Sequence, residues 1–271
     1  MIWRTITYTL LAAGAAFCAF PFVWMMTTAF MTYEEVTSPS LVFLPATWQW
    51  GNVAEVFRAE PYFVRYFMNT FLVATAITFA VIVTSVMAGY AFARLTFKGK
   101  HLCFALILST MMIPFEITII PNFITIQRLG WYDSYAALII PWCANGFSIF
   151  LLRQAFLGIP RDFFDAAKVD GCGHFRFLYW IATPLVRPMV VTVAIFAFLG
   201  SYNALIWPLV VTSSRAMRVV QVGLTVFWGA EGVRFNLLMC ASAVVIMPTV
   251  GLYFLAQRHF LESSLSAGIK G

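Results

Sequence analysis

The chain has 271 residues, of which 62% are hydrophobic and only 10% charged, and its formal net charge is +6. A soluble domain typically carries about 25% charged residues, so this composition excludes an ordinary soluble enzyme and predicts an all-α integral membrane protein surrounded by the lipid bilayer. The basic excess follows from the topology described below, and no nucleic-acid partner is needed to explain it.

Six apolar stretches are long enough to cross a membrane as helices, because about 20 apolar residues span the hydrocarbon core. The first is too long for the apolar core of a signal peptide, and no small-residue cleavage site follows it, so we expect a retained helix. The whole chain, residues 1–271, is predicted to form a single transmembrane domain. We predict spans over residues 5–31, 67–93, 102–126 (interrupted by Pro114 and Pro121), 135–156, 188–211 and 237–255.

Basic residues indicate how the spans are oriented. They are concentrated in the loops after the second and fourth spans, and the positive-inside rule places these loops and both chain termini in the cytoplasm. The segments 32–66 and 212–236 then face the other side of the membrane. The cytoplasmic basic residues of the two loops are Arg94, Lys98, Lys100, Arg153, Arg161, Lys168, Arg176 and Arg187.

A few polar residues within the spans are candidates for contact with a transported solute. Glu116 lies between two prolines of the third span, where a carboxylate usually faces a cavity or a partner. Pairing with another subunit, or a shallow position at the outer interface, is the alternative. In the fifth span, Tyr202, Asn203 and Trp207 combine aromatic rings with an amide, which suits a hydroxylated solute. Packing between helices explains these three residues equally well.

Residues 158–188 are rich in charged side chains and lie between two apolar stretches, so they must face water. Pro160 and Asp162 suit the start of a helix, which we predict over residues 161–169. Gly171 and Gly173 are predicted to end this helix, because glycine adopts left-handed conformations without strain. A second amphipathic helix is predicted to begin near residue 174 and to end before residue 184. Its shared face would consist of Phe175, Leu178, Tyr179 and Ala182.

This segment resembles the EAA loop of ABC importer permeases. Its run Asp165-Ala166-Ala167, three residues, Gly171, nine residues and Ile-Ala-Thr-Pro is similar to the family pattern Glu-Ala-Ala, three residues, Gly, nine residues, Ile-x-Leu-Pro. Asp165 stands where the pattern has glutamate, and Thr183 stands where it has leucine. The aspartate keeps the negative charge, but its side chain is shorter. The resemblance implies a six-helix, type I permease whose cytosolic coupling loop docks on an ATPase. Residues expected at that contact are Arg161, Asp165, Ala166, Ala167, Asp170 and Gly171.

Further stretches resemble permeases of the carbohydrate-uptake subgroup. Residues 89–99, GYAFARLTFKG, are similar to the pattern Ala-Tyr-Ala-x-x-Arg-x-x-Phe-x-Gly, and residues 201–209 are similar to Ser-Trp-Asn-x-x-x-x-Pro-Leu. The resemblance implies a multi-pass protein of the cytoplasmic (inner) membrane of a prokaryote. Its implied partners are a second permease subunit, a cytoplasmic ATPase dimer and an extracytoplasmic solute-binding protein. Segments 32–66 and 212–236 are then candidates for docking the binding protein, although the aromatics of the former also suit an interfacial anchor.

No nucleotide-binding loop of the form G-x-x-x-x-G-K-[ST] occurs in the sequence. We therefore expect no enzymatic activity, catalytic residue, metal site or cofactor in this chain, and ATP and Mg are expected on the partner ATPase. The resemblance implies import of a sugar or oligosaccharide, with glycerol-3-phosphate or a glycerophosphodiester as the alternative. A neutral sugar is favoured because, apart from Arg153, the spans contain no cationic side chain. An ion-coupled secondary transporter is the alternative from another class, and only Glu116 would serve it.

Overall fold

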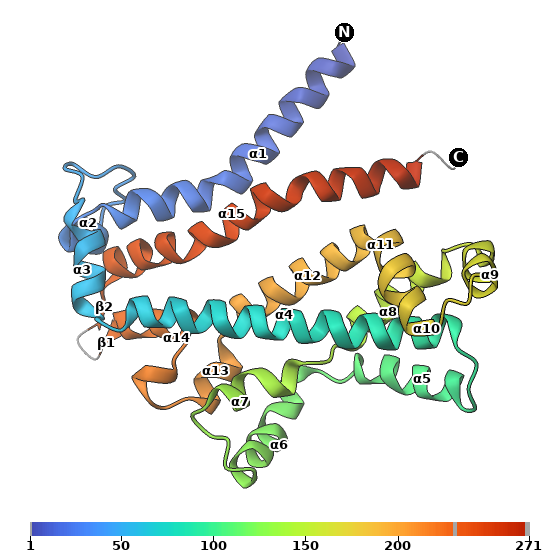
Figure 1. Cartoon of the computed structure of the whole chain (residues 1–271). Coiled ribbons are helices and arrows are strands. Elements are labelled where there is room, and N and C mark those ends of the chain that lie inside the picture. The colour runs from blue at the N-terminus through green and yellow to red at the C-terminus, as the bar shows by residue number, and fades with distance from the viewer. Residues whose placement is uncertain (1, 230–231, 269–271) are drawn as a thin grey trace. The chain divides into compact units, whose positions relative to one another are not determined.

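The computed structural model describes residues 2–229 and 232–268, which form helices and one short hairpin (Figure 1). The hairpin pairs β1 (Trp228–Gly229) with β2 (Gly232–Val233) in antiparallel register. The predicted all-α class is confirmed. Contacts divide the chain into two compact units, Met1–Tyr66 with Val220–Leu252 and Phe67–Val219 with Tyr253–Gly271. A single transmembrane domain over residues 1–271 stays a prediction.

The first unit contains the predicted external segment 32–66, which folds locally. A capping box starts its first helix, because the Thr32 N–H donates to Glu35 Oε2 at 2.8 Å and the Glu35 N–H donates to Thr32 Oγ1 at 3.2 Å. The Ala46 N–H donates to Glu35 Oε1 at 2.8 Å, and these backbone hydrogen bonds lower the pKa of Glu35. The elements of this unit are α1 (Ile2–Ala29), α2 (Tyr33–Thr37), α3 (Gly51–Ala59), α14 (Val220–Leu224), η4 (Thr225–Phe227), the hairpin and the first part of α15 (Phe235–Gly268).

The second unit is built around α4 (Phe63–Arg94), whose first turn belongs to the first unit. Close packing of α4 on α8 (Gly146–Leu157) requires Gly89, since a Cβ there would lie 3.0 Å from the Arg153 backbone nitrogen and 3.1 Å from Leu152 Cβ. The other elements are α5 (Lys100–Thr110), α6 (Phe115–Arg128), α7 (Tyr135–Ile139), η1 (Ile140–Trp142), α9 (Arg161–Val169), α10 (His174–Phe177), η2 (Leu178–Ala182), α11 (Thr183–Leu185), α12 (Arg187–Tyr202), α13 (Ile206–Val211) and η3 (Arg215–Met217).

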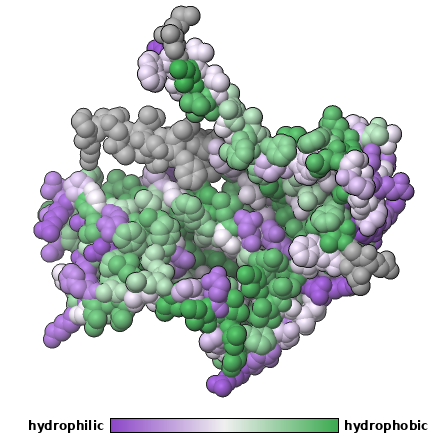
Figure 2. Space-filling view, turned by 180° about the vertical axis from the view of Figure 1, so that it is seen from behind, coloured by the Kyte–Doolittle hydropathy of each residue, from purple (hydrophilic) through white to green (hydrophobic). Residues whose placement is uncertain are grey.

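Within the described residues, four helical segments are long and apolar enough to cross a membrane, or up to six if each of two bent pairs is one span. The four are Trp3–Ala29, Phe63–Arg94, Tyr135–Leu157 and Phe235–Phe254. Large apolar side chains are exposed along them, including Phe17 on α1 and Phe79 on α4, and Figure 2 shows how widely hydrophobic residues cover one face. Such surface suits lipid contact and would be a liability in water.

The predicted third span is bent by 99° between α5 and α6. We expected breaks at both Pro114 and Pro121, and the second expectation was wrong. Pro114 precedes α6 in an extended conformation, with ψ 136°, whereas Pro121 lies inside a continuous α6. An interior proline removes one hydrogen bond, which α6 tolerates here, while a proline ahead of a helix fixes its start.

The predicted fifth span, residues 188–211, is also interrupted. α12 ends at Tyr202 and α13 begins at Ile206, with Pro208 in the first turn of α13, where no intrahelical N–H is needed. The segment here that is long and apolar enough for one span is instead a pair of helices, His174–Leu185 and Arg187–Tyr202. The angle of the bend between them is 83°. Pro188 marks this bend, because it occupies the first turn of α12.

Two polar side chains tie together segments that are distant in sequence at one end of the second unit. Asn69 Nδ2 donates to the carbonyls of Ala216 (2.9 Å) and Arg218 (2.8 Å), and its Oδ1 accepts from the Tyr135 hydroxyl at 2.7 Å. Asn69 is buried, so these hydrogen bonds offset the loss of its hydration.

Asp133 makes the second of these ties. Its N–H donates to the Val211 carbonyl at 2.9 Å, and its Oδ1 accepts from the N–H groups of Ser213 (2.9 Å) and Ser214 (3.1 Å). Its φ of 57° is left-handed, a conformation that aspartate tolerates better than most residues. Burial raises the pKa of the carboxyl, but the hydrogen bonds from Ser214 and Ser213 outweigh it, so the pKa of Asp133 is lowered.

Candidate functional site

The predicted coupling residues lie on α9 and its C-terminal corner. α9 covers Arg161–Val169, as predicted, and follows Pro160. Gly171 has φ +72°, and two backbone hydrogen bonds close a Schellman motif around it, from the Cys172 N–H to the Ala167 carbonyl (2.8 Å) and from the Gly171 N–H to the Lys168 carbonyl (3.1 Å). The conformation predicted for Gly171 is therefore confirmed.

α9 presents its polar side outward. Ala167 is buried, while the other five predicted coupling residues are exposed, namely Arg161, Asp165, Ala166, Asp170 and Gly171. The structure thus brings these residues together on one exposed surface. Whether an ATPase contacts them stays a prediction.

The chain after the corner differs from the predicted second helix. Gly173 is extended, with φ −72° and ψ 163°, so a left-handed conformation was wrong there. The helix also passes Pro184, because η2 is a π-helical turn that leads into α11, where Pro184 lies in the first turn. The extra residue of a π turn shifts the helical phase. Leu178 and Ala182 are buried, but Phe175 is 77% exposed and Tyr179 69%, so these four residues do not share a face.

Aromatic and polar contacts hold this corner against the end of α4. The Tyr90 hydroxyl lies 3.0 Å from His174 Nδ1, and the Phe164 ring stacks on the His174 ring with centroids 5.6 Å apart. Phe164 also meets Phe177 edge to face at 5.3 Å. α10 lies beside the C-terminal end of α4 in Figure 1. Residues 158–185 together form what we call the elbow.

Two arginines fix the backbone that leads into the elbow. Arg94 Nη2 donates to the Phe156 carbonyl at 2.9 Å and to the Ile159 carbonyl. Arg153 Nε donates to the Phe92 carbonyl at 3.3 Å, and its Cζ lies 4.2 Å from the Phe104 ring centroid. Charged donors strengthen such hydrogen bonds. The anchoring roles of Tyr90 and Arg94 were missed, although both occur in the stretch 89–99 that resembles permeases.

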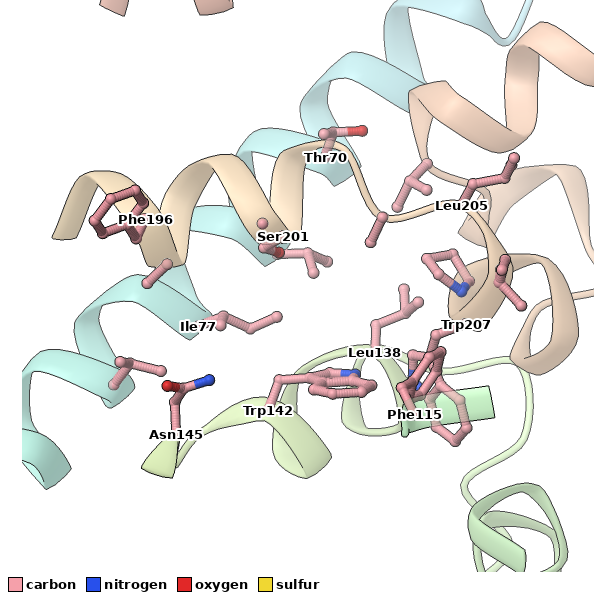
Figure 3. Close-up of a pocket in the computed structure, with 18 of the residues that line it drawn as sticks. Thr70, Ile77, Phe115, Leu138, Trp142, Asn145, Phe196, Ser201, Leu205 and Trp207 are labelled. Atoms are coloured by element: carbon pink, nitrogen blue, oxygen red, sulfur yellow. The ribbon is translucent and has the colours of Figure 1, made fainter. Parts of the chain in front are cut away.

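The second unit also contains an open cavity of about 570 Å³. One wall is aromatic, because Phe115, Trp142 and Trp207 meet in a corner with ring centroids 5.2 to 6.4 Å apart (Figure 3). The polar groups of the lining are Thr70, Asn145, Ser148 and Ser201, from α4, the start of α8 and α12. None of the described lining residues is charged.

Of the four residues predicted for the solute path, only Trp207 lines this cavity. Glu116 is exposed in the first turn of α6. Tyr202 is buried against Phe198 and Phe71, and Asn203 is exposed beyond the end of α12, where its Nδ2 donates to the Leu199 carbonyl at 3.0 Å. Contact of any of the four with solute stays a prediction. Sequence reasoning missed Phe115 and Trp142, which no periodicity marks.

Comparison with known proteins places the chain among transport components. Residues 80–260 match the family described as "Binding-protein-dependent transport system inner membrane component". The arabinooligosaccharides transport system permease protein AraQ of Halalkalibacterium halodurans is 32% identical over 268 residues, which cover 97% of this chain and 96% of that relative. The sn-glycerol-3-phosphate transport system permease protein UgpE of Yersinia enterocolitica is 29% identical over 263 residues, 94% of this chain and 93% of the relative.

A solved structure supports the fold. A bacterial ABC transporter involved in the import of the acidic polysaccharide alginate contains a chain that superposes with a TM-score of 0.85, covering 96% of each chain at 20% identity. Membership of this family favours a permease over an ion-coupled secondary carrier, and it implies an ATPase and a binding protein as partners. The chain is therefore a multi-pass protein of the bacterial inner membrane and belongs to the family of binding-protein-dependent ABC importer permeases, as a non-catalytic transmembrane subunit.

Proposed function

We propose that this chain is one of two different permease subunits of an importer that carries a neutral sugar or oligosaccharide into the cell. The similarity to AraQ, a permease protein of an arabinooligosaccharides transport system, supports a sugar, and so does the absence of charge from the described cavity lining. One chain supplies one elbow, whereas an ATPase dimer offers two equivalent surfaces. A second permease is therefore expected beside this one.

The elbow is proposed as the contact through which the ATPase dimer moves the permease. The observation that carries this proposal is that the elbow has two different sides. Arg161, Asp165 and Asp170 are exposed, while Ala167 and Phe177 are buried and the Phe164 ring packs edge to face on Phe177. An exposed polar face can meet a partner, and a packed back transmits displacement because close-packed side chains do not deform freely. ATP and Mg bind to the ATPase in this scheme, and the elbow faces the cytoplasm together with both chain termini.

Motion of the elbow would reach the membrane helices through α4 and α8. Tyr90 and Arg94 lie on the last turns of α4. Arg94 donates to the carbonyl of Phe156, in the last turn of α8, and to the carbonyl of Ile159, just after α8. ATP-driven closure of the ATPase dimer would therefore displace both helices together. Such a rigid displacement can switch a cavity between outward and inward access. The external segment 32–66 is the proposed docking surface for the binding protein.

The test of the coupling role is the pair Gly171→Val and Gly173→Val in the assembled importer. Both positions leave open space for a side chain, but only Gly171 has a positive φ. A β-branched residue is strongly disfavoured there, at roughly 1–2 kcal/mol or more, so Gly171→Val should distort the corner while Gly173→Val should not. We expect Gly171→Val to abolish uptake with normal amounts of protein in the membrane. Unchanged uptake by Gly171→Val would exclude the elbow as the coupling element.

Glycerol-3-phosphate or a glycerophosphodiester is the second candidate substrate, because UgpE relatives also cover most of the chain. The two candidates differ in charge. An anion in the cavity would find no cationic side chain among the described lining residues, and burying an unpaired charge is costly. Uptake of radiolabelled neutral oligosaccharide and glycerol-3-phosphate by the same proteoliposomes separates them, and uptake of the phosphate alone would contradict our choice.

A further inference from the structure

We propose that the cavity of the second unit is a binding site for one ring of an uncharged sugar, so that this chain itself contacts the solute. The inference rests on the proposed function as a sugar importer and names the site where selection would occur. The cavity volume of about 570 Å³ lies within the range of about 300–1,000 Å³ that is usual for small-molecule sites. Its residues come from α4, α6, α7, η1, α8, α12 and α13, all within the second unit.

The aromatic corner supplies the apolar part of the site. Trp207 is buried, and its Nε1–H donates to the Ala137 carbonyl at 2.9 Å, so the indole is held in place and offers only its ring to the cavity. Trp142 meets both Trp207 (5.9 Å) and Phe115 (5.2 Å) nearly edge to face. The C–H groups on one side of a sugar ring are apolar and weakly positive, which matches the negative face of an aromatic ring.

Polar groups lie away from that corner, where the hydroxyls of a stacked sugar would point. Asn145 Oδ1 already accepts from the Ser148 N–H (2.9 Å) and hydroxyl (3.1 Å). The carbonyl oxygen of the amide therefore caps the start of α8. Its NH2 group remains as a donor, and Figure 3 shows the amide nitrogen on the cavity side. Ser201 brings a hydroxyl from α12 in the opposite wall, which can both donate and accept.

The lack of charge decides the ligand class. A phosphate or carboxylate would have to leave water for a lining in which no described residue is cationic. A sugar hydroxyl needs only the neutral donors and acceptors that Asn145 and Ser201 provide. The combination of a fixed aromatic corner, two neutral polar groups and no charge therefore selects an uncharged, hydroxylated ring.

The test uses the complete importer with its binding protein in proteoliposomes, supplied with radiolabelled arabinotriose and maltotriose. Trp142→Ala removes the stacking surface, and Asn145→Ser removes the amide donor while keeping a good N-cap for α8. We expect each to lower the uptake rate at limiting sugar about tenfold, whereas Trp142→Phe should keep most of the uptake. Phe79→Ala is the matched control, because Phe79 is 69% exposed on α4 and does not line the cavity.

A second measurement separates loss of the site from loss of the fold. ATP hydrolysis stimulated by the loaded binding protein should stay at the wild-type level in both variants, because the elbow and the external segments are unchanged. Wild-type uptake by Trp142→Ala and Asn145→Ser, in an importer that does carry a neutral sugar, would overturn the cavity site and leave the proposed function standing. If the unmodified importer carries glycerol-3-phosphate and no neutral sugar, the proposed function fails and the cavity site fails with it.

Discussion

The elbow and the cavity are both built from the second unit, yet they differ in almost every physical respect. The elbow is a short contiguous segment with charged residues outside and aromatic rings behind, whereas the cavity draws its lining from residues 70 to 219 and contains no charge among the described lining residues. The elbow is fixed by hydrogen bonds at identifiable atoms, such as Tyr90 to His174 and Arg94 to Phe156. The cavity is shaped mainly by packing.

This difference predicts that the two regions fail in different ways when they are changed. Damage to the elbow should lower both transport and binding-protein-stimulated ATP hydrolysis, because the contact with the ATPase or its transmission is altered. Damage to the cavity should leave stimulated hydrolysis intact and reduce transport of the solute. Uptake and binding-protein-stimulated ATPase activity, measured on the same proteoliposomes, therefore distinguish the two regions.

Among the hydrogen-bonding side chains, the largest effect is expected for Arg94→Met, which removes the donor to the carbonyls of Phe156 and Ile159. Hydrogen bonds from a charged donor contribute about 1.5–3 kcal/mol each, so the attachment of α4 to the junction between α8 and the elbow should be weakened severely. We predict that uptake falls by about tenfold or more and that stimulated ATPase activity falls with it.

Two controls define that result. Arg94→Lys keeps the charge but lacks the planar fork that reaches two carbonyls, so it should restore function only in part. Lys98→Met removes an exposed cation from the same loop and should change neither readout. If Arg94→Met lowers uptake while stimulated ATPase activity stays normal, the elbow fails in the same way as the cavity, which contradicts the expected difference between the two regions.

A smaller effect is expected for Tyr90→Phe, which deletes only the hydroxyl 3.0 Å from His174 Nδ1. The ring contacts with Phe156 and Phe177 would remain. A single neutral hydrogen bond contributes about 0.5–1.5 kcal/mol, so stimulated ATPase activity should decrease by roughly two- to tenfold. Tyr179→Phe, at an exposed ring of the same elbow, should have no effect, and an equal loss in both variants would count against a specific role of Tyr90.

The same contrast explains what could be predicted from the sequence. α9 and the left-handed Gly171 were predicted to the residue, because Pro160, Asp162 and Gly171 encode a helix start and end locally. The π turn before Pro184 was not, since no local signal distinguishes it from an α-helix. The aromatic corner of the cavity was missed apart from Trp207, because Phe115 and Trp142 become its neighbours only after separate segments pack together.

The smallest predicted effect concerns Asp133, which joins the segment before α7 to the segment after α13 and so closes one end of the helices that line the cavity. Its folded-state pKa is lowered, so its charged form stabilises the fold above the ordinary aspartate pKa of about 3.9, and this contribution is lost as the pH falls through the folded value. Asp133→Asn keeps the acceptor oxygen and tolerates a positive φ, but it removes the charge.

We therefore expect the Tm of the purified importer to be about 1–2 °C lower for Asp133→Asn than for wild type at pH 7, and the difference to vanish as the pH is lowered below about 4. The partial exposure of Asp133 and screening by salt keep the effect small. Asp133→Ala should lower the Tm further at both pH values, because it loses the acceptor for Ser213 and Ser214 and is strained at φ 57°. A constant difference between Asp133→Asn and wild type across this pH range would show that the charge of Asp133 contributes nothing to stability at this end of the cavity.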